Sequence, residues 1–228
     1  MVAPTGKETD GFVSRYLNRR LSFLFTRVLL FTMPNISPNV VSFVSFVIGS
    51  LGAIFFSLKW GILAGLVVQL SSVLDGCDGE IARLQGKSSH FGAFFDSILD
   101  RYADSFIIMG LVAYCLRTIP TRQIFNLFRI NDALILLIGI LALAGTYQVS
   151  YSAAKGQAEF FRDFPRTLQG RDTRLFIIFL VGLASPFDPG FVFLGLLIIT
   201  LLTNSSVVWR MSIASRWRPI AKKRKFDH

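Results

Sequence analysis

Residues 75–100 have the sequence DGCDGEIARLQGKSSHFGAFFDSILD, and the rest of the chain is organised around them. It contains four aspartates in a chain that is otherwise apolar and basic, at Asp75, Asp78, Asp96 and Asp100. An aspartate in a membrane helix costs roughly 2.5 to 3.5 kcal/mol, so four unpaired ones cost about 10 kcal/mol. The nearby cations are too few and too peripheral to neutralise them, namely Arg83, Lys87 and Arg101. We therefore expect divalent ions to balance the charge.

The spacing of the aspartates supports a metal site. On a helix, Asp75 and Asp78 lie about 60° apart and Asp96 and Asp100 about 40° apart, so each pair shares a face. Carboxylates without Cys or His suit hard cations, so we expect Mg²⁺ or Mn²⁺. Four carboxylates match two divalent ions and leave coordination open for a diphosphate.

The composition indicates one all-α integral membrane domain. The 228 residues are 52% hydrophobic and include 23 Phe, and the mean hydropathy is +0.54. The two cysteines, Cys77 and Cys115, are too far apart along the chain for a disulfide to be expected.

Six apolar segments are expected to cross the membrane within residues 29–212. The first follows the turn at residues 34–39 and ends at residue 58, and the second runs from residue 60 into the aspartates. The other four cover residues 92–116, 133–154, 174–187 and 190–209. Residues 10–28, within an amphipathic segment 1–28, predict an interfacial helix with apolar residues at helical spacing and a cationic side. A soluble helix is the alternative. Residues 213–228 form a basic tail.

The distribution of Lys and Arg predicts the orientation. With six spans, most of these residues share one side with both termini, and the other side has only Lys59, Arg117, Arg122 and Arg129. Both termini and the aspartates are therefore expected to face the cytoplasm.

The same aspartates resemble the signature of the CDP-alcohol phosphatidyltransferases. This chain matches its eight fixed positions at Asp75, Asp78, Gly79, Ala82, Arg83, Gly92, Asp96 and Asp100. The resemblance implies an enzyme that moves a phosphoalcohol group from a CDP-linked donor to the hydroxyl of an acceptor alcohol and releases CMP. It also implies a homodimer.

The resemblance implies roles for individual residues. Asp75, Asp78 and Asp96 would be metal ligands, and Asp100 would be both a ligand and the catalytic base. The implied donor-binding residues are Asn39, Gly79, Arg83 and Ser89. For Asn39, a helix cap is the alternative. For Asp104, one turn beyond Asp100, pairing with Arg101 and tuning of the metal site both stay open.

The acceptor is expected to be a phosphorylated alcohol such as inositol phosphate or glycerol phosphate. The basic loop after residue 154 could bind its phosphate through Lys155, Arg171 and Arg174. The alternative is that these cations only satisfy the positive-inside rule. Relatives that use inositol phosphate have Tyr-x-Lys-Ala-Arg at the end of the fourth span. Residues 151–155 of this chain are YSAAK, so Ala153 stands where those relatives have their first basic residue.

The opening stretch, with DGFVSR at 10–15 and NRR at 18–20, resembles a branch that makes di-inositol phosphate. In that branch this domain follows a cytidylyltransferase, for which residues 1–28 are too few. The expected donor is CDP-diacylglycerol or CDP-inositol. The basic tail fits anionic membrane lipid better than nucleic acid.

Two functions are alternatives to a transferase. A cation transporter could use the same carboxylates, but the sequence shows no inverted repeat or polar path across the midplane. The second is a non-catalytic structural relative of the family, and the complete set of signature residues argues against it.

Overall fold

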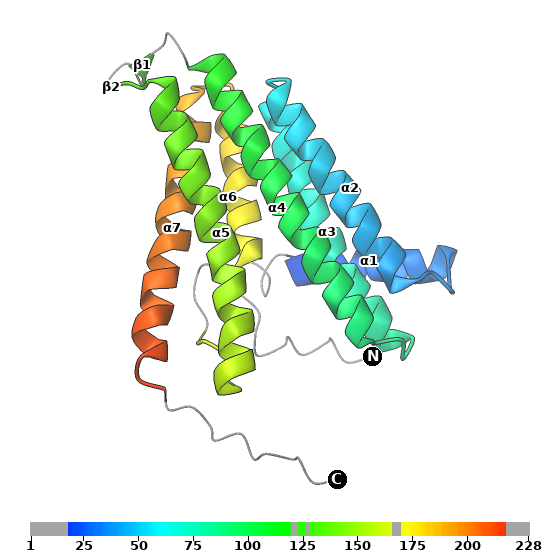
Figure 1. Ribbon diagram of the computed structural model, residues 1–228. Helices are drawn as coiled ribbons and strands as arrows, with labels where there is room; N and C mark the ends of the chain where they lie inside the picture. The colour runs from blue at the N-terminus through cyan, green and yellow to red at the C-terminus, as the bar shows by residue number, and fades with distance from the viewer. Residues whose placement is uncertain (1–17, 120–122, 126–127, 166–169, 218–228) are drawn as a thin grey trace.

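The computed structural model describes residues 18–119, 123–125, 128–165 and 170–217. Seven helices and a two-stranded hairpin make up this part of the chain. They are α1 (Arg19–Thr32), α2 (Pro38–Ser57), α3 (Gly61–Leu84), α4 (His90–Thr118), β1 (Gln123–Ile124), β2 (Phe128–Arg129), α5 (Asp132–Phe160), α6 (Arg171–Ala184) and α7 (Gly190–Ala214). In Figure 1, α2 to α7 form a bundle of lengthwise helices, and α1 runs across it near one end.

Local signals explain where several helices begin. Pro38 opens α2 with a fixed φ, and Ser37 is its N-cap, so Asn39 is inside the first turn and is not the cap. The Ser89 hydroxyl accepts a hydrogen bond from the Gly92 amide at 3.0 Å and caps α4. At α5 the Asn131 side chain does the same for the Leu134 amide at 2.9 Å.

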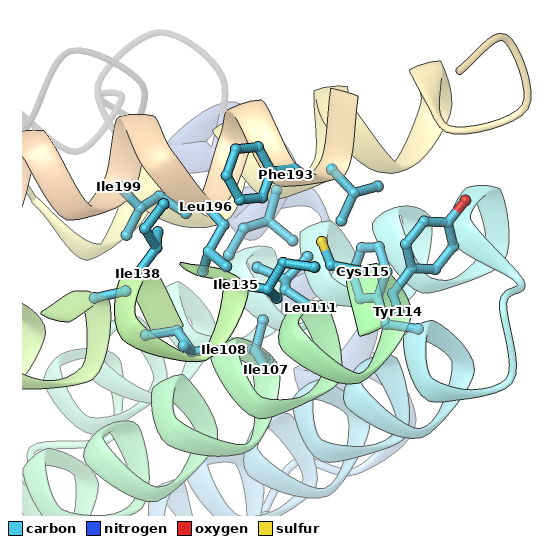
Figure 2. Close-up of a cluster of buried hydrophobic side chains, with 14 of the residues drawn as sticks. Ile107, Ile108, Leu111, Tyr114, Cys115, Ile135, Ile138, Phe193, Leu196 and Ile199 are labelled. Atoms are coloured by element: carbon cyan, nitrogen blue, oxygen red, sulfur yellow. The ribbon is translucent and has the colours of Figure 1, made fainter. Parts of the chain in front are cut away.

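The main core lies away from the aspartates, where α4, α5 and α7 meet. Figure 2 shows α4 side chains such as Leu111 packing with Ile135 of α5 and Leu196 of α7, all fully buried. On the other side of α4, Gly110 allows close approach of α2, because a Cβ there would lie 2.6 Å from the Ala53 carbonyl oxygen. Both cysteines are buried and free, as expected.

All six segments predicted to cross the membrane form helices, but only some are typical spans. By length and apolar composition, α2, α3, α5 and α7 could each cross a membrane. Helix α4 has 29 residues and contains the charges Asp96, Asp100, Arg101 and Asp104. Helix α6 has 14 residues, about 21 Å, which is shorter than the ~30 Å hydrocarbon core. The four apolar helices indicate a multi-pass membrane protein.

Helix α1 overlaps the predicted helix over residues 10–28 and extends four residues beyond it. Its described part begins at Arg19 and continues to Thr32, and residues 10–17 lie outside the described range. The helix buries Ser22 and Thr26 and exposes Leu24, Val28 and Phe31. It therefore turns its polar stripe inward and its apolar stripe outward. Most of the basic tail, 218–228, also lies outside the described range.

Candidate active site

Three of the four signature aspartates converge. Asp75 of α3 and Asp96 and Asp100 of α4 each offer a carboxylate oxygen, and these oxygens all lie within 4.8 Å of one another. The helical spacing explains this, because each helix turns its two aspartates toward the other helix. All three residues are partly buried.

Asp78 lies beside this cluster in a more buried position. Its carboxylate accepts a hydrogen bond from the Ser42 hydroxyl of α2 and another from the Gly79 backbone amide. Sequence reasoning missed Ser42. The available signal was a hydroxyl one turn after Pro38, on a largely apolar helix that also contains three other serines, so that signal is weak.

An arginine from a distant part of the chain bridges the carboxylates. Arg171, the first residue of α6, places its Nη1 at 2.8 Å from Asp75 Oδ1 and 2.7 Å from Asp100 Oδ1. Its Nε donates to Asp104 Oδ1 at 3.2 Å, and Arg174 Nη2 lies 2.6 Å from Asp104 Oδ2. Asp104 thus pairs with two arginines of α6.

Arg101, the alternative partner considered for Asp104, contacts other groups. Its Nη2 lies 3.4 Å from Asp100 Oδ2, and its Nη1 donates to the Ser150 hydroxyl of α5. Asp100 therefore lies between two guanidinium groups, those of Arg101 and Arg171.

The three predicted acceptor residues separate in the structure. Arg171 lies in the carboxylate cluster and lines a cavity. Arg174 is 4% exposed and is held behind it by Asp104. Lys155 lies on the exposed side of α5, where it pairs with Glu159 at 2.7 Å.

A cavity of about 420 Å³ opens on one side of the carboxylates, between the start of α2, the end of α3 and the start of α4. All four predicted donor-binding residues line it: Asn39, Gly79, Arg83 and Ser89. Asp78 and Asp96 form the wall toward the metal-site cluster.

A second cavity of about 260 Å³ lies on the other side, bordered by α1, α3, α4 and α6. Asp75 and Arg171 line it, and it shares four lining residues with the first cavity, namely Asp78, Gly79, Arg83 and Asp96. The two cavities thus meet at the carboxylates.

The carboxylate cluster fits a divalent ion. Mg²⁺ binds oxygen at 2.0–2.1 Å in an octahedron, so opposite ligands lie about 4.2 Å apart. The mutual separation of up to 4.8 Å among the three aspartate oxygens is close to this span. The oxygen-only donor set also favours a hard cation such as Mg²⁺ or Mn²⁺.

A buried acid beside the site was not singled out as functional from the sequence. Glu80, two residues after Asp78, accepts hydrogen bonds from Ser22 at 2.8 Å and Thr26 at 2.9 Å, both on α1. The sequence signal was a carboxylate in an apolar segment with serine and threonine four residues apart far upstream.

Comparison with known proteins agrees with this geometry. The family model described as CDP-alcohol phosphatidyltransferase matches residues 35–217. The chain is 35% identical over 208 residues to a bifunctional IPC transferase and DIPP synthase of Archaeoglobus fulgidus, covering 87% of this chain and 38% of that protein. The Thermococcus kodakarensis protein of the same name is 40% identical over 178 residues, covering 75% and 37%. This chain therefore spans less than two fifths of either relative.

Another relative matches over most of its length. It is the archaetidylinositol phosphate synthase of Pyrococcus horikoshii, 29% identical, with 79% of this chain and 85% of that protein covered. Among solved structures, the phosphatidylinositol phosphate synthase of Mycobacterium tuberculosis with CDP-DAG bound aligns with a TM-score of 0.70 at 22% identity, covering 87% of this chain and 95% of the other. A form of that enzyme in complex with manganese and citrate aligns with a TM-score of 0.68. These likenesses show a shared fold.

Proposed function

Since this chain belongs to the CDP-alcohol phosphatidyltransferase family, an enzyme family of transferases, we propose that it moves a phosphoalcohol group from a CDP-linked donor to the hydroxyl of an acceptor alcohol and releases CMP. One observation carries the proposal: two cavities meet at the carboxylate cluster, and all four residues expected to bind the donor line one of them. That arrangement supports donor and acceptor approaching the same centre from opposite sides.

In this proposal Asp75, Asp78, Asp96 and Asp100 hold two divalent ions, Mg²⁺ or Mn²⁺. The ions would neutralise the diphosphate and stabilise the leaving CMP. Ser42 fixes the orientation of Asp78 through its hydrogen bond.

Asp100 is proposed to take the proton from the acceptor hydroxyl. Its two oxygens lie beside Arg171 and Arg101, at 2.7 and 3.4 Å, and these contacts hold the carboxylate in place. On the donor side, Gly79 has no side chain to block a nucleotide, and a Cβ there would meet only Arg83 Nη1, at 3.4 Å.

The substrates we propose follow from the cavities and the relatives. The donor is CDP-diacylglycerol or CDP-inositol, and the acceptor is a phosphorylated alcohol, inositol phosphate or glycerol phosphate. Three arginines on the second cavity support an anionic acceptor, namely Arg19, Arg83 and Arg171. Lys155 and Arg174 are less well placed to contact it directly.

The test is CMP release by purified protein in lipid, with Mg²⁺ or Mn²⁺ and each pair of these donors and acceptors. Asp100→Asn should abolish turnover while the protein stays folded, because the amide cannot accept the proton. The matched control is Asp132→Asn, an exposed aspartate at the start of α5. Full activity of Asp100→Asn would remove Asp100 from the role of base, and inactivity of the wild type with every pair would reject the reaction.

We further propose that all six helices α2 to α7 cross the membrane within residues 29–212, and that α1 lies in the cytoplasmic interface. The exposed apolar side of α1 supports this position. An impermeant maleimide should label Lys87→Cys from the cytoplasmic side and Lys59→Cys from the opposite side. The reverse pattern would contradict the proposed orientation.

We also propose a homodimer. Helix α4 has a continuous exposed apolar stripe at steps of three or four residues, made by Phe91, Phe94, Ile98, Tyr102, Phe106 and Met109. In native membranes Ile98→Cys should form a crosslinked dimer, and Val40→Cys on α2 is the exposed control. Equal crosslinking at both positions would reject α4 as the interface.

A further inference from the structure

Helix α1 closes one side of the second cavity. Its first turns contribute Asn18, Arg19 and Ser22 to the lining, and none of these lines the donor cavity. The helix crosses the bundle near one end (Figure 1). A segment lying outside the family model's match, which begins at residue 35, therefore forms part of the wall of this cavity.

Buried hydrogen bonds fix the position of α1 on α3. The Asn18 amide donates to Ser72 at 2.9 Å and accepts from Gln69 at 2.8 Å. One and two turns further along α1, Ser22 and Thr26 both donate to Glu80. These contacts repeat every four residues, so rotating or sliding α1 would break all of them together. Arg19, one residue after Asn18, is held at the cavity by the same contacts.

With the proposed metal ions bound, the charge on the second cavity would favour an anion near α1. Arg19, Arg83 and Arg171 come from three different helices, and Arg83 also lines the donor cavity. Arg171 bonds to Asp75 and Asp100. Five carboxylates line the same cavity. Asp75, Asp78 and Asp96 belong to the proposed metal site, where divalent ions would neutralise them, and the other two are Glu80, which accepts hydrogen bonds from α1, and Asp172. Arg19 therefore adds positive charge specific to this cavity.

We propose that Arg19 contacts the phosphate of the acceptor, which makes α1 a determinant of acceptor specificity, and that Glu80 is the positioning residue that holds α1 in place. This rests on the proposed function. A guanidinium suits this role because it can form two parallel hydrogen bonds to a phosphate.

The test measures KM for donor and acceptor separately, with CDP-diacylglycerol as donor and inositol phosphate or glycerol phosphate as acceptor. For Arg19→Gln, KM for the phosphorylated acceptor should rise about tenfold or more, since a charged hydrogen bond is lost. KM for the donor should stay within about twofold, because Arg19 does not line the donor cavity. Arg20→Gln is the matched control, since Arg20 is exposed, carries the same charge and does not line either cavity. It should behave like the wild type.

Three more variants distinguish these roles from a general loss of structure. Arg19→Lys should give an intermediate KM for the acceptor, because it keeps the charge and loses the two-point contact. Glu80→Ala should reproduce the acceptor-specific rise, while Glu80→Gln, which can still hydrogen-bond to both hydroxyls, should stay close to the wild type. A plain structural defect in Glu80→Ala would instead change both KM values together and would overturn its positioning role.

The outcomes separate this inference from the proposed function. If wild-type protein releases CMP but Arg19→Gln and Arg20→Gln give the same acceptor KM, the assignment of Arg19 is wrong and the reaction stands. If the wild type releases no CMP with any donor and acceptor pair, the proposed function fails and this inference fails with it.

Discussion

The ion pair between Asp104 and Arg174 tests whether burial sets how much stability is lost when an ion pair is broken. The two side chains are 3% and 5% exposed and lie 2.6 Å apart, and Arg171 also contacts Asp104. Breaking a buried pair by removing one partner costs about 3 to 5 kcal/mol, because the remaining charge is left uncompensated. We expect this cost for Asp104→Asn, which leaves two arginines without their shared carboxylate. For a chain of this size that corresponds to a fall in Tm of roughly 6 to 20 °C.

The surface pair between Lys155 and Glu159 is the matched control. Its distance is 2.7 Å, almost the same, but both side chains are 53% exposed. An exposed pair of this kind is worth about 0.3 to 0.5 kcal/mol, so Lys155→Gln should shift Tm by no more than about 2 °C.

The assay is thermal unfolding in detergent, followed by tryptophan fluorescence. Arg174→Gln and the double variant Asp104→Asn with Arg174→Gln complete a double-mutant cycle. The double variant should lose less than the sum of the single losses, with a coupling of about 1 to 3 kcal/mol. Additive losses, or equal Tm shifts for Asp104→Asn and Lys155→Gln, would refute the claim that burial sets the strength of these pairs.

Further outcomes follow from the same contacts. Gly110→Ala should lower Tm, because its Cβ would lie 2.6 Å from the Ala53 oxygen and such overpacking costs about 1 to 3 kcal/mol. By contrast, Gly79→Ala should leave Tm unchanged and weaken donor binding. Ser42→Ala removes the side-chain partner of Asp78, so affinity for Mn²⁺ measured by calorimetry should fall about tenfold; unchanged affinity would show that Ser42 does not support the metal site. Chelation by EDTA should stop CMP release, and added Mg²⁺ or Mn²⁺ should restore it; activity that persists in EDTA would contradict a metal-dependent reaction.

Features with a local cause could be predicted from the sequence. The helix period alone places Asp75 and Asp78 on one face and Asp96 and Asp100 on another, and three of these four carboxylates converge in the structure. The six apolar segments also became helices close to their expected bounds. In both cases neighbouring residues determine the result.

Features that join distant parts of the chain could not be predicted in the same way. The sequence offers an acceptor phosphate or the positive-inside rule as reasons for Arg171, and nothing local indicates that it contacts Asp75, 96 residues earlier. The inward side of α1 was also not foreseen. Ser22 and Thr26 are small and weakly polar, so a pattern of apolar spacing takes no account of them, yet both bond to Glu80.

The short helix α6 begins at the level of the carboxylate cluster. Gly182 of α6 packs on Gly65 of α3, where a Cβ at Gly182 would lie 2.9 Å from the Gly65 Cα. Since Gly61 packs near Ser185, the two helices run in opposite directions. Eleven residues back along α6 is Arg171, and eleven forward along α3 is Gly76, so α6 begins level with the aspartates.

Helix α3 continues from that level to Leu84, another eight residues or about 12 Å. The second cavity, lined by Arg171 and Leu175 of α6, lies at this level. A longer apolar helix in this place would fill the space and exclude the proposed polar acceptor. The short length that makes α6 a poor membrane span is thus the same feature that leaves room beside the carboxylates for the proposed acceptor, while α1 closes the second cavity from the side.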